Sequence, residues 1–373
     1  MKKIFFTIAI SCAVFLSVQA QKTIYVTNPT DLNRMEVISI PYGSFAKHFG
    51  VDTIFSIRDK SSGQLVVHQL EKLGNEVVKN VLVQIKIAPN AELRLTVNKE
   101  PALAVKSKTY ARYVPERFDD FAWENDLVAF RMYGKALEGR NDDAQGMDYW
   151  AKRTEDLVID KWYKQNDYHK DHGEGMDYYS VGQSLGAGDL ALYYDNKIHF
   201  TKHYRQYQIL DNGPLRTSFR LIFEPQDIAG KMVSLTKTIS IDAGQQFNRI
   251  EVILKSEGTK ETPLVVGIAK RSESEPKFEY DASERTLWYW EPDFNNFGHT
   301  GIALFVPKAK IQFISDDLKQ YLLKTEVKND TPFVYYNGAA WNKAEKITSA
   351  AAWGDYVEDF AESIKKPLKI KLK

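Results

Sequence analysis

Residues 215–254 read LRTSFRLIFEPQDIAGKMVSLTKTISIDAGQQFNRIEVIL, and this stretch decides the fold class. Apolar and polar side chains alternate along it in runs of about ten residues, which is typical of β-strands with one buried face. The positions that share one face are Leu215, Thr217, Phe219, Leu221 and Phe223, then Val233, Leu235, Ile239 and Ile241, then Ile250, Val252 and Leu254. Breaks are expected at residues 225–227 and 242–244. Long consecutive strands with short connections predict a large antiparallel sheet.

The same alternation nearer the N-terminus predicts a β-sheet region over residues 21–105. Residues 81–87 and 93–97 alternate on either side of Pro89-Asn90, so a hairpin is expected there. A second turn is predicted at residues 61–63, between the strand-like segments 53–58 and 65–69.

Near the C-terminus the apolar spacing becomes helical. The positions concerned are Trp353, Tyr356, Val357, Phe360 and Ile364. Pro367 should end this helix, and a short strand over residues 368–372 follows it. The sequence therefore predicts a mostly β protein: a large antiparallel β-sandwich of the galactose-mutarotase supersandwich type over residues 106–373, continuous with residues 21–105, with a short C-terminal helix. A β-propeller is the alternative, but no repeat of blade length is present.

Residues 1–20 have the pattern of a secretory signal peptide. Lys2-Lys3 precedes an apolar run over residues 4–18, and Val18-Gln19-Ala20 suits cleavage. A mature chain beginning at Gln21 and a periplasmic or secreted location are expected. The alternative is lipid attachment at Cys12, although the apolar run continues beyond that residue.

Composition excludes several classes of function. Cys12 is the single cysteine, so the mature chain is expected to contain no disulfide, thiolate nucleophile or cysteine-ligated zinc. The 50 basic and 49 acidic residues balance without a basic run, which argues against nucleic acid as a partner. The apolar run at the N-terminus is too short for a comfortable membrane span. Aromatic residues, at 13%, suit both a β-rich core and sugar binding.

The most polar and aromatic stretch is YHKDHGEGMDYYSVGQSLGAGD at residues 168–189. Histidine titrates near neutrality, so this stretch suggests proton transfer. The candidate catalytic residues are Tyr168, His169, His172 and Glu174, with Asp177 as a substrate-binding candidate. The same side chains suggest a divalent metal site, although their spacing matches no standard zinc motif. A polar surface turn is the third interpretation.

Two further segments combine aromatic, carboxylate, amide and guanidinium groups, the mixture with which proteins bind sugars and carboxylates. The substrate-binding candidates are Trp123, Glu124, Asn125 and Arg131 in the first, and Trp150 and Arg153 in the second. Arg216, in the Asn-Gly-Pro-Leu-Arg segment at 212–216, is another candidate for an anionic group. The alternatives are a core tryptophan in a capped loop and structural ion pairs.

The segments WEND at 123–126, GMDYWAKR at 146–153, the 168–188 block, NGPLR at 212–216 and AAWGDYVEDF near the end resemble the domain-of-unknown-function family numbered 4861. That family is common in secreted proteins of polysaccharide-degrading bacteria. Some members act as oligosaccharide dehydratases that make a 4,5-unsaturated uronate.

The resemblance implies β-elimination on a uronic-acid-terminated oligosaccharide, with no certain cofactor and a divalent metal as a possibility. Elimination needs a base for the C5 proton, an acid for the leaving group and a group that neutralises the carboxylate. The alternatives are a sugar mutarotase or epimerase, and a sugar-binding protein without catalytic activity.

Overall fold

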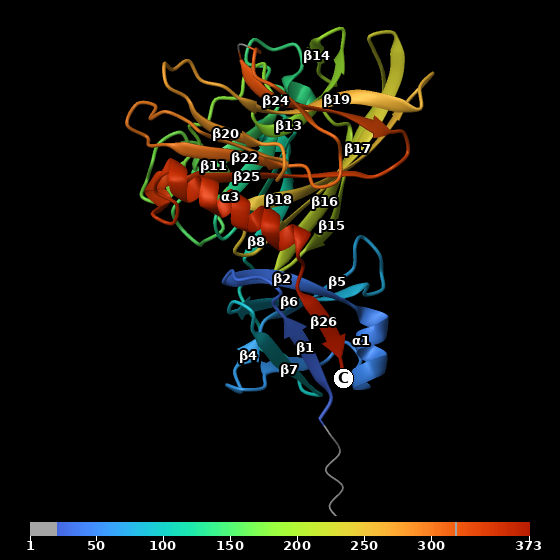
Figure 1. The fold of residues 1–373 in the computed structure, drawn as a ribbon. Helices are drawn as coiled ribbons and strands as arrows, with labels where there is room; N and C mark the ends of the chain where they lie inside the picture. The colour runs from blue at the N-terminus through green and yellow to red at the C-terminus, as the bar shows by residue number, and fades with distance from the viewer. Residues whose placement is uncertain (1–20, 318) are drawn as a thin grey trace, which may run out of the picture.

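The computed structural model describes residues 21–317 and 319–373. The predicted signal peptide therefore lies outside the described residues. Figure 1 shows a large sandwich of strands above a smaller β region built from the N-terminal strands. The predicted mostly β architecture is confirmed. Among the described residues, no helix is long and apolar enough to cross a bilayer.

One layer of the sandwich is an eight-stranded antiparallel sheet. Its strands, in spatial order, are β15 (Gln206–Asn212), β16 (Arg216–Ile228), β17 (Lys231–Asp242), β18 (Phe247–Ser256), β25 (Phe333–Trp341), β22 (Thr300–Phe305), β21 (Thr286–Trp290) and β20 (Lys277–Asp281).

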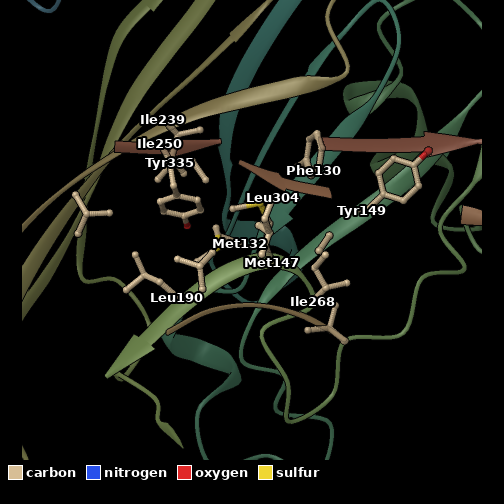
Figure 2. Packing of buried hydrophobic residues seen from close by; sticks show 14 of the residues in the cluster. Phe130, Met132, Met147, Tyr149, Leu190, Ile239, Ile250, Ile268, Leu304 and Tyr335 are labelled. Atoms are coloured by element: carbon tan, nitrogen blue, oxygen red, sulfur yellow. The ribbon is translucent and has the colours of Figure 1, made fainter. Parts of the chain in front are cut away.

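Two five-stranded sheets face this layer. The first runs β12 (Gly175–Met176), β11 (Met147–Lys152), β10 (Ala129–Met132), β9 (Asp120–Asn125) and β8 (Thr109–Val114). The second runs β14 (Lys197–His199), β13 (Ala187–Tyr194), β19 (Glu261–Ala269), β24 (Gln320–Lys328) and β23 (Gln312–Ile314). One buried apolar cluster joins all three sheets, and Figure 2 shows Met147, Leu190, Ile239, Ile268 and Leu304 meeting inside it.

The opening stretch forms β16, β17 and β18 in the pairing that the alternation predicts. The expected break at residues 225–227 is wrong. Pro225 lies inside β16, where the register shifts between Phe223 and Gln226, and the turn falls instead at Ala229-Gly230, which both have positive φ. A strand tolerates proline at such an irregularity because a ladder hydrogen bond is already lost there.

The N-terminal region contains two sheets rather than one. The five-stranded sheet runs β26 (Lys369–Leu372), β1 (Thr23–Thr27), β7 (Glu92–Asn98), β3 (Ser56–Asp59) and β4 (Leu65–Val66), and the three-stranded sheet runs β2 (Arg34–Pro41), β6 (Asn80–Ile87) and β5 (His68–Glu71). The short helix α1 (Tyr42–Phe49) follows β2. A shared apolar cluster lies between these elements.

The turn at residues 61–63 is confirmed, because β3 and β4 pair across it. The hairpin expected between residues 81–87 and 93–97 is wrong, since β6 pairs with β2 and β5 while β7 pairs with β1 and β3. Both segments have one buried face, but alternation does not specify which partner supplies the hydrogen bonds.

The predicted C-terminal helix is confirmed as α3 (Ala350–Lys365). Ser349 caps it by accepting a hydrogen bond from the Ala352 amide, and Trp353 and Val357 are buried against the eight-stranded sheet. The chain then returns to the N-terminal region, where β26 pairs with β1 (Figure 1). The last strand of the 106–373 segment thus belongs to the N-terminal sheet.

The two parts of the molecule are joined by buried polar contacts. The Gln69 side chain of β5 accepts from the Leu215 and Arg216 amides at 2.8 Å and donates to the Arg216 carbonyl at 3.0 Å. The Arg216 guanidinium bonds Asp242 on its own sheet and reaches Glu71 of β5 at 3.3 Å. These contacts hold the start of β16 against the N-terminal region.

The pairing of β26 with β1 generates a stability prediction. Ile370→Ala should lower the free energy of unfolding by about 1–2 kcal/mol, because its half-buried side chain packs on the N-terminal cluster. Urea unfolding measures this change. Lys371→Ala, the adjacent exposed position of β26, should shift it by less than about 0.5 kcal/mol. Equal effects from the two variants would contradict the packing of this strand.

Candidate functional site

Arg131 of β10 lies at the centre of a buried group of three aspartates on the outer face of its sheet. Arg131 Nη2 is 2.6 Å from Asp148 Oδ2 of β11 and 3.0 Å from Asp177 Oδ2, and Nη1 is 3.7 Å from Asp120 Oδ2 of β9. Strand pairing sets Arg131 directly opposite Asp148. We call these four residues the Arg131 cluster.

The Arg131 cluster holds three carboxylates against one guanidinium. Desolvation by burial raises the pKa of Asp120 and of Asp148 to about 7, and the pKa of Asp177 to about 6, although Arg131 opposes each shift. Several polar atoms of the cluster lack a hydrogen-bond partner within the described part of the chain: both Asp120 carboxylate oxygens, Asp148 Oδ1, and Arg131 Nε and Nη1. Buried groups of this kind are uncommon outside functional sites.

Aromatic rings cover the cluster on its outer side. The Trp150 ring stacks on Trp162 of α2 (Ile159–Gln165), at 5.5 Å between centroids, and on Tyr168, at 5.1 Å. The Arg131 guanidinium lies 5.3 Å from the centroid of the Trp150 ring. The Tyr168 hydroxyl accepts a hydrogen bond from Arg117 Nε at 3.2 Å. Trp150 and Tyr168 are buried, so they seal the cluster rather than form the open sugar platform and the proton donor that the sequence suggested.

His169 links this buried cluster to solvent. Its Nδ1 lies 2.9 Å from the Asp177 carbonyl oxygen and 3.7 Å from the Asp177 carboxylate, while 66% of its side chain is exposed. A carbonyl only accepts, so Nδ1 carries the hydrogen and the lone pair of the neutral ring lies on Nε2. The result is a largely exposed imidazole ring that is held in place by a buried aspartate residue.

His172 and Glu174 lie on the same loop but are held by other partners. His172 Nε2 is 3.3 Å from the half-exposed Asp167 carboxylate, and the Glu174 carboxylate accepts from Lys161 Nζ at 2.7 Å. Within the described part of the chain, neither side chain forms an ion pair or hydrogen bond with the Arg131 cluster. Within residues 21–317 and 319–373, no group of three or more His, Cys, Asp or Glu side chains is arranged to hold a metal ion.

Arg153 is the candidate guanidinium that remains accessible. Its Nε donates to the Gly173 carbonyl at 3.1 Å, Nη2 pairs with Asp171, and its guanidinium lies 5.1 Å from the Trp341 ring. About 30% of its side chain is exposed. It therefore contacts the same loop as His169, with a single side-chain carboxylate as partner.

The structure places Trp123, Glu124 and Asn125 in the interior, which corrects their predicted contact with a sugar. Trp123 Nε1 donates to Asn248 across the sandwich at 2.8 Å. Glu124 pairs with Lys152 Nζ at 2.7 Å and accepts the first amides of α2, and Asn125 organises the turn at Leu127 and Val128. All three candidates are fully buried, because β9 is covered on both faces.

Arg131 and Arg216 are also corrected as carboxylate clamps. Three aspartates surround the buried Arg131 guanidinium, and Arg216 forms a bidentate pair with Asp242 besides its contact with Glu71. Each of these two guanidinium groups is therefore already engaged by two or more carboxylates of the chain. The position of Arg216 at the start of its strand and at the rim of the sandwich agrees with its place after a Gly-Pro turn.

Sequence reasoning missed several residues around this site. Asp120 and Asp148 were not singled out, although alternation along β9 and β11 places them on the face of Trp150 rather than on the core face. The aromatic series Trp341, Tyr178, Phe297 and the exposed Phe294 extends from the Arg153 guanidinium, with centroid distances of 5.7–6.3 Å between neighbours. Tyr178 and Trp341 are far in sequence from each other and from Phe294 and Phe297, so no local pattern reveals the series.

Comparisons with known proteins identify a family and a fold. A family model described as "Domain of unknown function (DUF4861)" matches residues 26–370. The chain is 32% identical over 375 residues to "Uncharacterized protein P7" of Formosa agariphila, covering 94% of this chain and 93% of that protein.

Two solved structures from Enterococcus faecalis share the fold. They are a protein in the glycosyl hydrolase family 38, with a TM-score of 0.54 and 10% identity, and an alpha-mannosidase, with 0.50 and 9%. Each match covers 94% of this chain, which spans about half of those chains, 47% and 46%. At such low identity the likeness shows the β-sandwich fold alone.

The raised pKa values in the Arg131 cluster generate a pH prediction. A carboxyl whose pKa is higher in the folded than in the unfolded chain binds more protons when folded, so its contribution to stability falls as the pH rises from about 4 to about 7. Asp120→Asn removes one such group. The loss of unfolding free energy between about pH 5 and about pH 8 should be smaller in this variant than in the wild type.

Denaturant titrations at the two pH values measure the difference. The exposed Asp142→Asn, a matched carboxyl outside the cluster, should keep the wild-type pH dependence. If Asp120→Asn also keeps it, Asp120 does not titrate in this range.

Proposed function

The chain belongs to the family described as a domain of unknown function, DUF4861, and we propose that it is a periplasmic or secreted enzyme that acts on uronic-acid-terminated oligosaccharides by β-elimination. The observation that carries the proposal is the His169 ring, whose Nδ1 is held by the Asp177 carbonyl while 66% of its side chain is exposed. The glycosyl hydrolase family 38 description of a structural neighbour agrees with a sugar substrate.

His169 is the proton-transfer group of the proposed reaction. Nε2 takes the C5 proton of the uronate, the electrons of the C5–H bond form the C4–C5 double bond, and the bond from C4 to its oxygen substituent breaks. The departing oxygen takes a proton, which the imidazolium carries after the first step. The carboxylate of Asp177 lies 3.7 Å from Nδ1 and stabilises the transient positive charge of the ring.

Arg153 is the proposed binding group for the substrate carboxylate. Negative charge builds on that carboxylate as the C5 proton leaves, and a guanidinium stabilises it with two parallel hydrogen bonds. Arg153 is already bound to Asp171, which lies in the loop that begins at His169. A substrate carboxylate would take the place of Asp171 on the guanidinium, so both reacting groups act on one part of the substrate.

The proposal predicts the effect of removing His169. His169→Ala should lower the rate on a uronate oligosaccharide by about 10²–10⁴-fold, since a general base is lost, while the fold persists because the side chain is exposed. The assay follows the near-ultraviolet absorbance of the conjugated product. Lys170→Ala, the adjacent exposed residue, is the matched control for loop damage. Wild-type turnover in His169→Ala would refute the assignment.

A second prediction concerns Arg153. Arg153→Lys keeps the positive charge but loses the two-pronged geometry, so the rate should fall by about tenfold or more. Arg140→Lys, an exposed arginine that also pairs with one aspartate, provides the comparison. The wild type should not turn over an oligosaccharide whose carboxylate is reduced to an alcohol. Equal turnover of this neutral sugar would exclude elimination and favour a mutarotase or epimerase, whereas binding without any turnover would indicate a sugar-binding protein.

A further inference from the structure

A cavity of about 580 Å³ lies between the N-terminal region, the outer face of the eight-stranded sheet and α3. Residues 32–37 form one wall from the N-terminal side, and Tyr356 and Phe360 of α3 form another. In Figure 1 this is where α3 descends across the sandwich toward β26. The volume falls within the range of about 300–1,000 Å³ that small-molecule sites occupy, and such sites are frequent where two parts of a protein meet.

The floor of the cavity follows from strand register. Ser218 of β16 is opposite Ser240 of β17, Ser240 is opposite Arg249 of β18, and Arg249 is opposite Tyr336 of β25. These positions alternate with core residues, so their side chains point out of the sandwich toward α3 and the N-terminal region. Because Ser218 and Ser240 are small, a hollow remains at their end of the row.

The charges along the walls are paired. Arg34 lies 2.9 Å from Glu36, Arg216 binds Asp242, and Arg249 binds a glutamate at 2.8 Å. Counting Glu71 and Asp359, the lining carries at least as many carboxylates as guanidinium groups. The cavity therefore offers alternating donors and acceptors without a net positive charge, which disfavours an anionic ligand and suits hydroxyl groups, each of which both donates and accepts.

Two polar atoms of the lining residues lack partners in the described part of the protein. They are Ser218 Oγ and Arg34 Nε, and both side chains are more than nine-tenths buried. Leaving a buried polar group without a partner is energetically unfavourable. Aromatic side chains line the same cavity: Phe247, Tyr336, Tyr356 and Phe360, of which Phe247 and Phe360 stack at 4.0 Å. Such apolar faces pack against the C–H surface of a sugar ring.

We propose that this cavity is a second carbohydrate-binding site, which takes a neutral, hydroxyl-rich sugar unit. This inference goes beyond the proposed function, because the cavity would bind a sugar without catalysing a reaction. It shares no residue with the Arg131 cluster, His169 or Arg153. The Arg216 pair with Asp242 and Glu71 forms part of its wall, so the same contacts that join the two parts of the molecule shape the site.

Isothermal titration calorimetry with a panel of neutral disaccharides (cellobiose, maltose, lactose and mannobiose) tests this site on the full mature chain. At least one should bind saturably, and glucuronate and inorganic phosphate should bind more weakly. Ser240→Tyr fills the hollow and should weaken binding by about tenfold or more. Thr236→Tyr, at an outward position of the same strand that does not line the cavity, should retain wild-type affinity.

Arg249→Ala provides a second variant in case Ser240→Tyr fails to fold, because Arg249 is partly exposed and its ion pair with Glu251 is partly exposed as well. It should also weaken binding by about tenfold. His169→Ala should bind the neutral sugar like the wild type, which separates this site from the proposed catalytic one. Absence of saturable binding, a preference for the anions, wild-type affinity in both cavity variants, or loss of binding in His169→Ala would each overturn the inference.

Discussion

The buried positive charge of Arg131 constrains the architecture around the candidate site. A guanidinium inside the protein must be paired, and removing one partner of a buried pair costs about 3–5 kcal/mol. Its partners come from β9, β11 and the segment that follows β12. The charge thus fixes the position of Asp177, and with it the loop that covers the outer face of this sheet.

This arrangement explains how an irregular loop can hold in place the groups that we propose to react. Buried contacts hold the loop over residues 166–175. The amide of Asp177, just after the loop, donates a hydrogen bond to the Tyr168 carbonyl at 2.8 Å, and the Tyr168 ring stacks on Trp150. Between these points His169 extends into solvent. Rigid support beneath an accessible side chain is what proton transfer requires, because the base must be both ordered and reachable.

The position of the N-terminal region against the sandwich depends on contacts between these two parts of the molecule. Gln69, Arg216 and the returning strand β26 connect the N-terminal region to the sandwich. Their positions leave a hollow where α3, β2 and the small outward residues of β16 and β17 meet. Because residues of both parts line this cavity, it keeps its shape only while the N-terminal region stays packed against the sandwich. The affinity of the cavity for a ligand would therefore also report on that packing.

Local sequence patterns predicted the mostly β class, the strands β16 to β18, the turn at 61–63 and the helix α3, because a buried face imposes alternation on a strand and helical spacing on a helix. The sequence also singled out the 168–189 segment with His169 and Asp177, and separately Arg153, since such mixtures of polar, charged and aromatic residues have no use in an apolar core. Only the tertiary structure decided that β6 and β7 belong to different sheets and that β26 returns to β1. Backbone hydrogen bonds are alike at every residue, so partner strands are chosen by packing between segments far apart in the chain. For the same reason, burial alone separated the enclosed Trp123 and Arg131 from the accessible His169, as exposure is a property of the surrounding fold and not of the residue.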